Sequence, residues 1–104
     1  MQRVRGGYRA RDGVIDVADA GRPFRLSDHA QQVIERRRID VDWVESVFTA
    51  PEKTEQDALD PQLRHALGRI EAYGDRVLRV VYNPAEKQPV IVTAFFDRSM
   101  KGNL

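Results

Sequence analysis

Residues 76–82 read RVLRVVY, and residues 89–96 read PVIVTAFF. Both runs are rich in β-branched and aromatic residues, and the segment between them, NPAEKQ at 83–88, has the composition of a turn. This pattern predicts a β-hairpin. Because the two runs are too apolar to face water on both sides, we expect the hairpin to form the centre of a sheet.

Two polar side chains interrupt this hairpin, Arg79 in the first strand and Thr93 in the second. An arginine in the middle of a strand is costly to bury unless it is paired or opens onto a site. Pairing Asn83 with Pro89 would place Arg79 opposite Thr93. A shift of one residue would put them on opposite faces, and the sequence leaves both registers open.

Two helices are expected before the sheet. The first begins at Ser27 or Asp28, both good N-caps, and runs through Arg37 or Arg38. Its apolar stripe reaches Arg37, which stands where a fourth apolar residue belongs. Asp40 is expected to cap a second, shorter helix.

Further strands are expected between the helices and the hairpin. Residues 53–56 are a candidate short strand, and residues 65–73 are strand-like, with Gly74 and Asp75 as a two-residue turn into the hairpin. This order predicts an α+β fold in which two N-terminal helices pack on an antiparallel sheet of three to four strands.

The chain divides into an N-terminal arm, residues 1–22, which we expect to be partly ordered at best, and a single domain, residues 23–104. Residues 1–11 carry four arginines and no acid, whereas residues 40–60 carry seven acids and one lysine. Residues 14–17 are the strand-like piece of the arm. The basic arm suits either an acidic partner such as nucleic acid or simple solvation.

The composition excludes several kinds of site. With no cysteine, the chain has no disulfide, thiolate zinc site or cysteine nucleophile. Two histidines, His29 and His65, are too few for a typical structural metal site, and we expect His65 to be structural or exposed. We expect no metal, no cofactor and no membrane span, and a cytoplasmic location.

A series of short motifs runs in order along the chain: LSDHA at 26–30, ERRRI at 35–39, a proline at 51, RVV at 79–81 and VT at 92–93. The series resembles a family of small bacterial domains of unknown function. That family is similar to the RelE/ParE-like toxins, with barnase-like, EndoU-like and colicin nuclease domains as proposed relatives. The resemblance covers roughly residues 24–98 and implies a RelE/ParE-like fold.

The resemblance also implies a set of site residues. His29, Arg79 and Thr93 match the family's helix histidine, strand arginine and strand threonine. Among three consecutive arginines, the spacing to Ile39 and the helical stripe both select Arg37 as the helix-end arginine. The predicted catalytic set is therefore His29, Arg37, Arg79 and Thr93.

This set is chemically suited to cleaving RNA without a metal. Histidine is an acid or base near neutral pH, arginine binds phosphate through a bidentate fork, and threonine can hydrogen-bond a phosphate oxygen. In the alternative hypothesis the arginines pair with acids inside the protein, and the chain is a non-catalytic module that binds a nucleic acid or a protein, such as a cognate antitoxin. The sequence does not decide between them, and it leaves the oligomeric state open.

Overall fold

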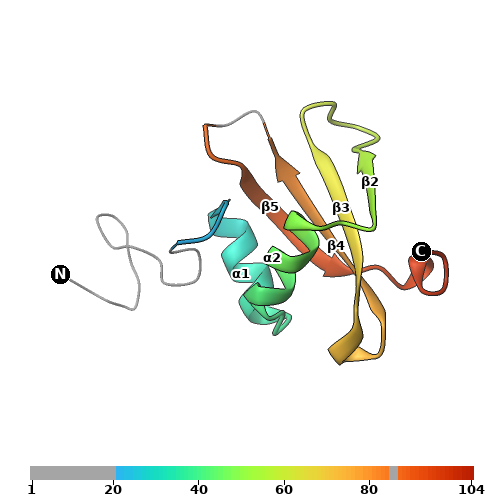
Figure 1. Ribbon diagram of the computed structural model, residues 1–104. Helices are drawn as coiled ribbons and strands as arrows, with labels where there is room; N and C mark the ends of the chain where they lie inside the picture. The colour runs from blue at the N-terminus through green and yellow to red at the C-terminus, as the bar shows by residue number, and fades with distance from the viewer. Residues whose placement is uncertain (1–20, 85–86) are drawn as a thin grey trace.

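The computed structural model describes residues 21–84 and 87–104, in which five strands form one sheet in the order β1-β5-β4-β3-β2 (Figure 1). Along the chain the elements are β1 (Arg25–Leu26), α1 (Asp28–Arg36), α2 (Val41–Thr49), β2 (Lys53–Gln56), β3 (Arg64–Ile70), η2 (Glu71–Tyr73), β4 (Arg76–Asn83), β5 (Val90–Phe96) and η3 (Arg98–Met100). The predicted central position of the hairpin is confirmed, because β4 is the middle strand and β5 is its neighbour.

The α+β class is confirmed, but the prediction of three to four antiparallel strands was wrong. The additional strand is β1, which pairs in parallel with β5 and makes the sheet mixed. It has two residues, too few for any periodic pattern to reveal it. The predicted strand-like piece at 14–17 and the arginines of the arm lie outside the described residues.

Both predicted helix caps are confirmed. The Ser27 hydroxyl accepts a hydrogen bond from the Ala30 N–H at 3.0 Å, and the Asp40 carboxylate accepts one from the Asp42 N–H at 2.8 Å. These bonds satisfy backbone donors that would otherwise be unpaired in the first turn. Arg37 is the C-cap of α1, at the end of the helix that the sequence predicts.

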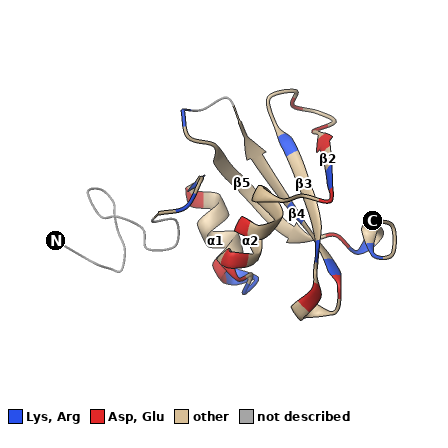
Figure 2. Ribbon diagram, viewed as in Figure 1, with Lys and Arg blue, Asp and Glu red and all other residues tan. Residues whose placement is uncertain are grey.

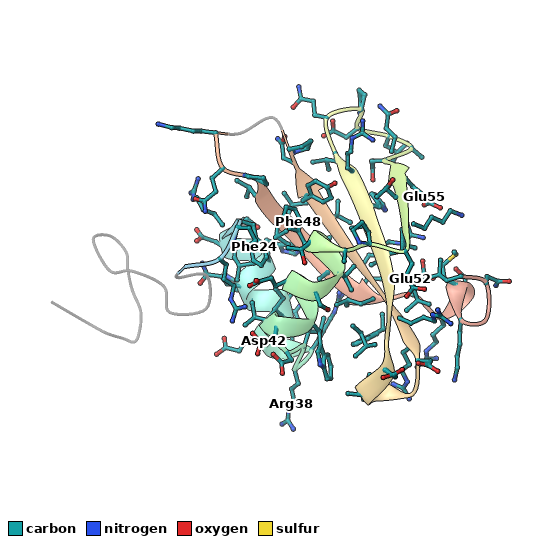
Figure 3. All side chains as sticks on the ribbon, viewed as in Figure 1. Phe24, Arg38, Asp42, Phe48, Glu52 and Glu55 are labelled. Atoms are coloured by element: carbon teal, nitrogen blue, oxygen red, sulfur yellow. The ribbon has the colours of Figure 1, made fainter. Side chains whose placement is uncertain are left out.

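The two helices cover one face of the sheet, here called the helix face (Figure 1). Gly68 of β3 identifies this face, because a Cβ atom placed there would lie 3.2 Å from a methyl group of Val47 in α2. Phe24 and Phe48 meet edge to face within the same layer, with ring centroids 5.3 Å apart (Figure 3). Phe48 and Val92 are half-buried, whereas the following apolar residues of the helices and the hairpin are buried: Val33, Ile34, Val44, Leu78, Val80 and Ala94.

The register of the β4–β5 hairpin begins as the shifted one of the two that the sequence left open. Asn83 pairs with Val90, one residue further along. Continued unchanged, that register would have separated the two polar side chains of the hairpin. The ladder shifts once more, however, where Tyr82 pairs with Ile91, and Val92 has no direct partner in β4.

Beyond this irregularity Val81 pairs with Thr93, and Arg79 pairs with Phe95. Cross-strand partners share a face, and so do residues two apart in one strand. Arg79 and Thr93 therefore lie on the same face as diagonal neighbours. Together the two one-residue shifts place Arg79 and Thr93 on one face, a choice that the sequence left open.

The β3–β4 connection is longer than predicted. Ile70 pairs with Arg76, so Gly74 and Asp75 are not a two-residue turn but the end of a connection that also contains η2. Both residues have positive φ, 70° and 58°, and the Asp75 N–H donates to the Ile70 carbonyl at 3.0 Å. Among residues 21–84 and 87–104, no helix has the length and apolar character needed to cross a membrane.

Candidate functional site

The face of the sheet turned away from α1 and α2, here called the far face, carries an arginine at its centre. Because Gly68 points to the helices, its neighbour Leu67 points to the far face, and so does Arg79, which pairs with Leu67. Leu67, Val77 and Val81 surround Arg79 and are buried, and the Arg79 side chain itself is 12% exposed. A cation in such surroundings is costly unless it is paired.

Partners occupy all three nitrogens of the Arg79 guanidinium. Nε donates to Asp97 Oδ2 at 2.9 Å, and Nη2 lies 2.9 Å from the same oxygen. Nη1 donates to Glu55 Oε1 at 2.9 Å and to His65 Nδ1 at 2.7 Å. We call these four residues, with Asp57, the Arg79 cluster. Its members come from β2, β3, β4, the β2–β3 loop and the residue after β5.

The hydrogen bonds of His65 fix its tautomer. Arginine has only donors, so His65 Nδ1 must accept the bond from Arg79, and the ring hydrogen resides on Nε2. Nε2 lies 2.6 Å from Asp57 Oδ1 and donates to it. The other oxygen of Asp57 accepts from the N–H groups of Leu59 and Asp60. His65 is thus a neutral imidazole that ties the β2–β3 loop to the sheet.

The same contacts shift the acidities of the cluster. The hydrogen bond from Arg79 lowers the pKa of Glu55, and the hydrogen bond from His65 lowers the pKa of Asp57. Both carboxyl groups are therefore ionised at neutral pH. Beside a neutral His65, the cluster holds three carboxylates and one guanidinium, which contacts two of them, Glu55 and Asp97, so the cluster is acidic as a whole.

Two opposing effects act on Arg79 and on Asp97. Burial acts to lower the pKa of Arg79, but the hydrogen bonds to Glu55 and Asp97 outweigh it, so the pKa is raised. The pKa of Asp97 is lowered, first by the hydroxyl of Ser99 and then, against the effect of burial, by Arg79. The charged forms of both groups are stabilised in the folded state.

The four predicted catalytic residues are divided between the far face of the sheet, which carries Arg79 and Thr93, and helix α1 with its C-cap, which carry His29 and Arg37. Thr93 lies on the far face with Arg79, half-buried, and its hydroxyl makes no hydrogen bond within the described residues. Arg37, at the end of α1, donates from Nη1 to the Ala94 carbonyl of β5 at 3.0 Å. His29 is exposed in the first turn of α1. Within the described parts of the chain, no hydrogen bond or ion pair joins any two of the four.

Sequence reasoning missed the partners of Arg79. Glu55 and Asp97 lie 24 and 18 positions from it in the chain, and no short-range motif connects them. One signal was available, because Glu55 falls inside the strand predicted at 53–56. His65 was expected to be structural or exposed, and it is half-buried with both ring nitrogens bonded.

The family of the chain is shown by comparison with known proteins. Its residues 26–96 match a family model described as a domain of unknown function (DUF4258). The chain belongs to this family. The DUF4258 match spans both helices and the strands through β5, and it includes every member of the Arg79 cluster except Asp97. The chain has no match among the curated proteins and none among the solved structures.

The DUF4258 description names no activity, so the likeness to RelE/ParE-like toxins stays a prediction from the sequence. In residues 21–84 and 87–104, no three histidine or acidic side chains are grouped so that they could hold a metal ion.

Proposed function

We propose that this DUF4258 domain is a non-catalytic module that binds a protein partner. The observation that carries the proposal is the internal pairing of Arg79. Its fork, the group best suited to a phosphate, is bonded to Glu55, Asp97 and His65. A phosphate would have to displace a carboxylate before it could reach this arginine.

Charge around the cluster also favours a protein over RNA. Three carboxylates lie at the cluster, and residues 40–60 carry seven acids against one lysine. Binding to nucleic acid depends on neutralising phosphates with cations, and nearby carboxylates oppose it. A protein surface with basic side chains suits this region better.

Leu59 supports a protein partner directly. It is 94% exposed, although it stands on a loop that is held by several hydrogen bonds. Asp57 accepts from two backbone N–H groups of this loop, and Asp60 accepts from the Gln62 N–H. A large apolar side chain on a preorganised loop costs little entropy to bury and is suited to an apolar pocket in a partner.

The resemblance to RelE/ParE-like toxins adds one class of partner and one competing function. The partner class is a cognate antitoxin. The competing function is metal-independent RNA cleavage by His29, Arg37, Arg79 and Thr93. The first of these is consistent with a binding module, whereas the second requires Arg79 to leave its internal partners.

The first experiment incubates the purified protein with labelled RNAs of several sequences in EDTA. We expect no cleavage by the wild type. Cleavage that is lost in Arg79→Ala or in His29→Ala would overturn the proposal in favour of the ribonuclease. Heat-treated protein controls for a contaminating nuclease.

The second experiment compares tagged wild type with Leu59→Ser and with Ala58→Ser, a matched change at the exposed neighbouring position. A partner captured by the wild type is identified, purified and titrated calorimetrically against all three proteins. We expect at least about a tenfold weaker affinity for Leu59→Ser only, equivalent to about 1.4 kcal/mol. Equal affinities would remove Leu59 as the anchor, and capture that nuclease treatment abolishes would point to nucleic acid.

A further inference from the structure

The two edges of the described sheet differ in what lies beside them. On one side β1 pairs with the start of β5, and α1 covers the later residues of β5. The Ser27 hydroxyl donates to the Val92 carbonyl at 3.4 Å, and Arg37 donates to the Ala94 carbonyl at 3.0 Å. On the other side β2 pairs with β3 and is the last strand of the described sheet (Figure 1).

The hydrogen-bond pattern shows which backbone groups of β2 point outward. Glu55 pairs with His65, and two residues further on the Asp57 N–H donates to the Leu63 carbonyl at 3.0 Å. Hydrogen-bonded positions alternate along an antiparallel ladder. Lys53 and Glu55 therefore direct their backbone groups toward β3, whereas Thr54 directs its N–H and C=O away from the sheet.

The charges along β2 would be complementary to those of a second copy of β2 that runs antiparallel to it. Lys53 and Glu55 flank Thr54 and lie on the same face of β2, because they are two residues apart in the strand. One is basic and the other acidic, and Figure 2 shows both kinds of charge on β2. Glu52 and Gln56 come next on either side, and Figure 3 shows both glutamates along this edge. In an antiparallel pair centred on Thr54, Lys53 of each chain lies opposite Glu55 of the other, and no two like charges are opposed.

We propose that two copies of this chain associate through their β2 edges, antiparallel about a two-fold axis beside Thr54. The two Thr54 residues exchange backbone hydrogen bonds, and two Lys53–Glu55 pairs form across the axis. Glu55 offers Oε2 for this pair, because Oε1 is held by Arg79 while Oε2 lies 3.3 Å from Lys53 of its own chain, which the lysine of the second copy replaces. This inference is independent of the proposed function.

The other edge explains why association stops at two copies. A sheet with two open edges would add further copies into a filament. In the described part of the chain, β1 and α1 border β5 while β2 has no further strand beside it, so pairing through β2 about a two-fold axis closes on itself. A lysine on an edge strand normally disfavours pairing with a second strand, but here Lys53 of one copy would lie opposite Glu55 of the other. The strand is short, so we expect a weak dimer with a dissociation constant on the order of 100 µM.

The test is sedimentation velocity and equilibrium of the full chain from roughly 10 µM to 1 mM, a range that brackets the expected constant. Thr54→Pro removes the outward N–H while leaving the bonds to β3, since proline is tolerated on the open side of an edge strand. Lys53→Glu places acids opposite acids. We expect each to weaken dimerisation at least about tenfold, and Lys87→Glu, the same charge change in the exposed hairpin loop, to leave it unchanged.

A charge-swap mixture makes the test specific. Lys53→Glu and Glu55→Lys are each expected to be monomeric alone, but their mixture restores opposite charges at both cross-strand positions and should form a heterodimer. Circular dichroism verifies that each variant is folded. If Glu55→Lys does not fold, the sedimentation of Thr54→Pro and Lys53→Glu decides whether the dimer forms through β2. A wild type that stays monomeric throughout the range would overturn the proposal, as would a dimer that both variants leave intact.

Discussion

Both faces of the sheet contain buried side chains, but the two faces are stabilised in different ways. On the helix face, apolar side chains of α1 and α2 pack on residues such as Leu78 and Val80, which are completely buried. On the far face, Leu67 is equally buried but lies beside Arg79, whose charge is held by Glu55 and Asp97. Apolar packing depends mainly on volume, whereas a buried ion cluster depends on each partner being in place.

The largest expected effect comes from truncating a leucine on each face. Leu78→Ala should lower the free energy of unfolding by about 3–5 kcal/mol, because the helices enclose the cavity that it leaves. Leu67→Ala should cost less, about 2–3 kcal/mol, because the long polar side chains beside it can relax into the space. Urea denaturation of both variants measures the difference.

Equal losses would contradict this distinction between the faces. The far face would then behave as a second apolar core, and the packing around Leu67 would be as rigid as that around Leu78. Val80→Ala serves as a further reference on the helix face, since Val80 is also completely buried.

The next effect concerns the two arginines of the far face that pair with carboxylates. Arg79 is 12% exposed and Arg69 is 51% exposed, where it pairs with Glu52. We expect Arg79→Ala to cost about 1–3 kcal/mol, because it leaves Glu55 and Asp97 close together without a cation. Arg69→Ala should cost clearly less than Arg79→Ala, because exposed ion pairs contribute little to stability.

Arg79→Lys refines this comparison. A lysine restores the charge but not the fork that reaches Asp97, Glu55 and His65 together, so it should recover only part of the lost stability. If Arg79→Ala and Arg69→Ala cost the same in urea titrations, burial of the cluster would have no energetic consequence.

The acid dependence of stability is a smaller effect with a defined sign. The pKa values of Glu55, Asp57 and Asp97 are lower in the folded state than their ordinary values near 4. Their contribution is therefore present above about pH 4 and is lost as the pH falls through the folded-state pKa values. Unfolding free energies between about pH 7 and 3 should be level at first and then decline.

Asp97→Asn is the matched variant for the pH series. It should be less stable than the wild type at neutral pH, and the difference should shrink below about pH 4, where the wild-type carboxyl also becomes protonated. A difference that stays constant down to pH 3 would show that ionisation of Asp97 contributes nothing to stability.

The smallest effect is expected at Thr93. Its hydroxyl makes no hydrogen bond within the described residues, and valine has nearly the same shape and suits a strand. Thr93→Val should therefore change the free energy of unfolding by less than about 0.5 kcal/mol. A larger loss, measured by urea denaturation, would reveal a polar role for Thr93 on the far face.

Much of the fold could be predicted because its signals are local. Ser27 and Asp40 cap their helices through bonds to residues two or three positions away. The strands at 53–56 and in the hairpin follow from composition and alternation over a few residues. The two-residue strand β1 has no such signal, since its position depends on pairing with β5 across the fold.

The candidate site was predicted only in part. The cost of burying a cation in mid-strand singled out Arg79 in the sequence. The same argument predicted that Arg79 must be paired or open onto a site. It could not name Asp57, His65 and Asp97 as members of the cluster, because each lies on another element. The family resemblance named His29 and Arg37 instead, and the structure places His29 in α1 and Arg37 at its C-cap, where Arg37 donates to the Ala94 carbonyl of β5.

By itself the sequence determined the helix caps, the central hairpin and the need of Arg79 for a partner, because these depend on residue type and near neighbours. Only the tertiary structure decided which groups pair with Arg79, namely Glu55, Asp97 and His65. Strand register is set by the whole sheet, and one shift at Val92 determines whether Thr93 lies on the face of Arg79 or on the other. The position of β2 was likewise decided by topology, since the order of the strands, and not the sequence of any one of them, makes β2 the last strand of the described sheet.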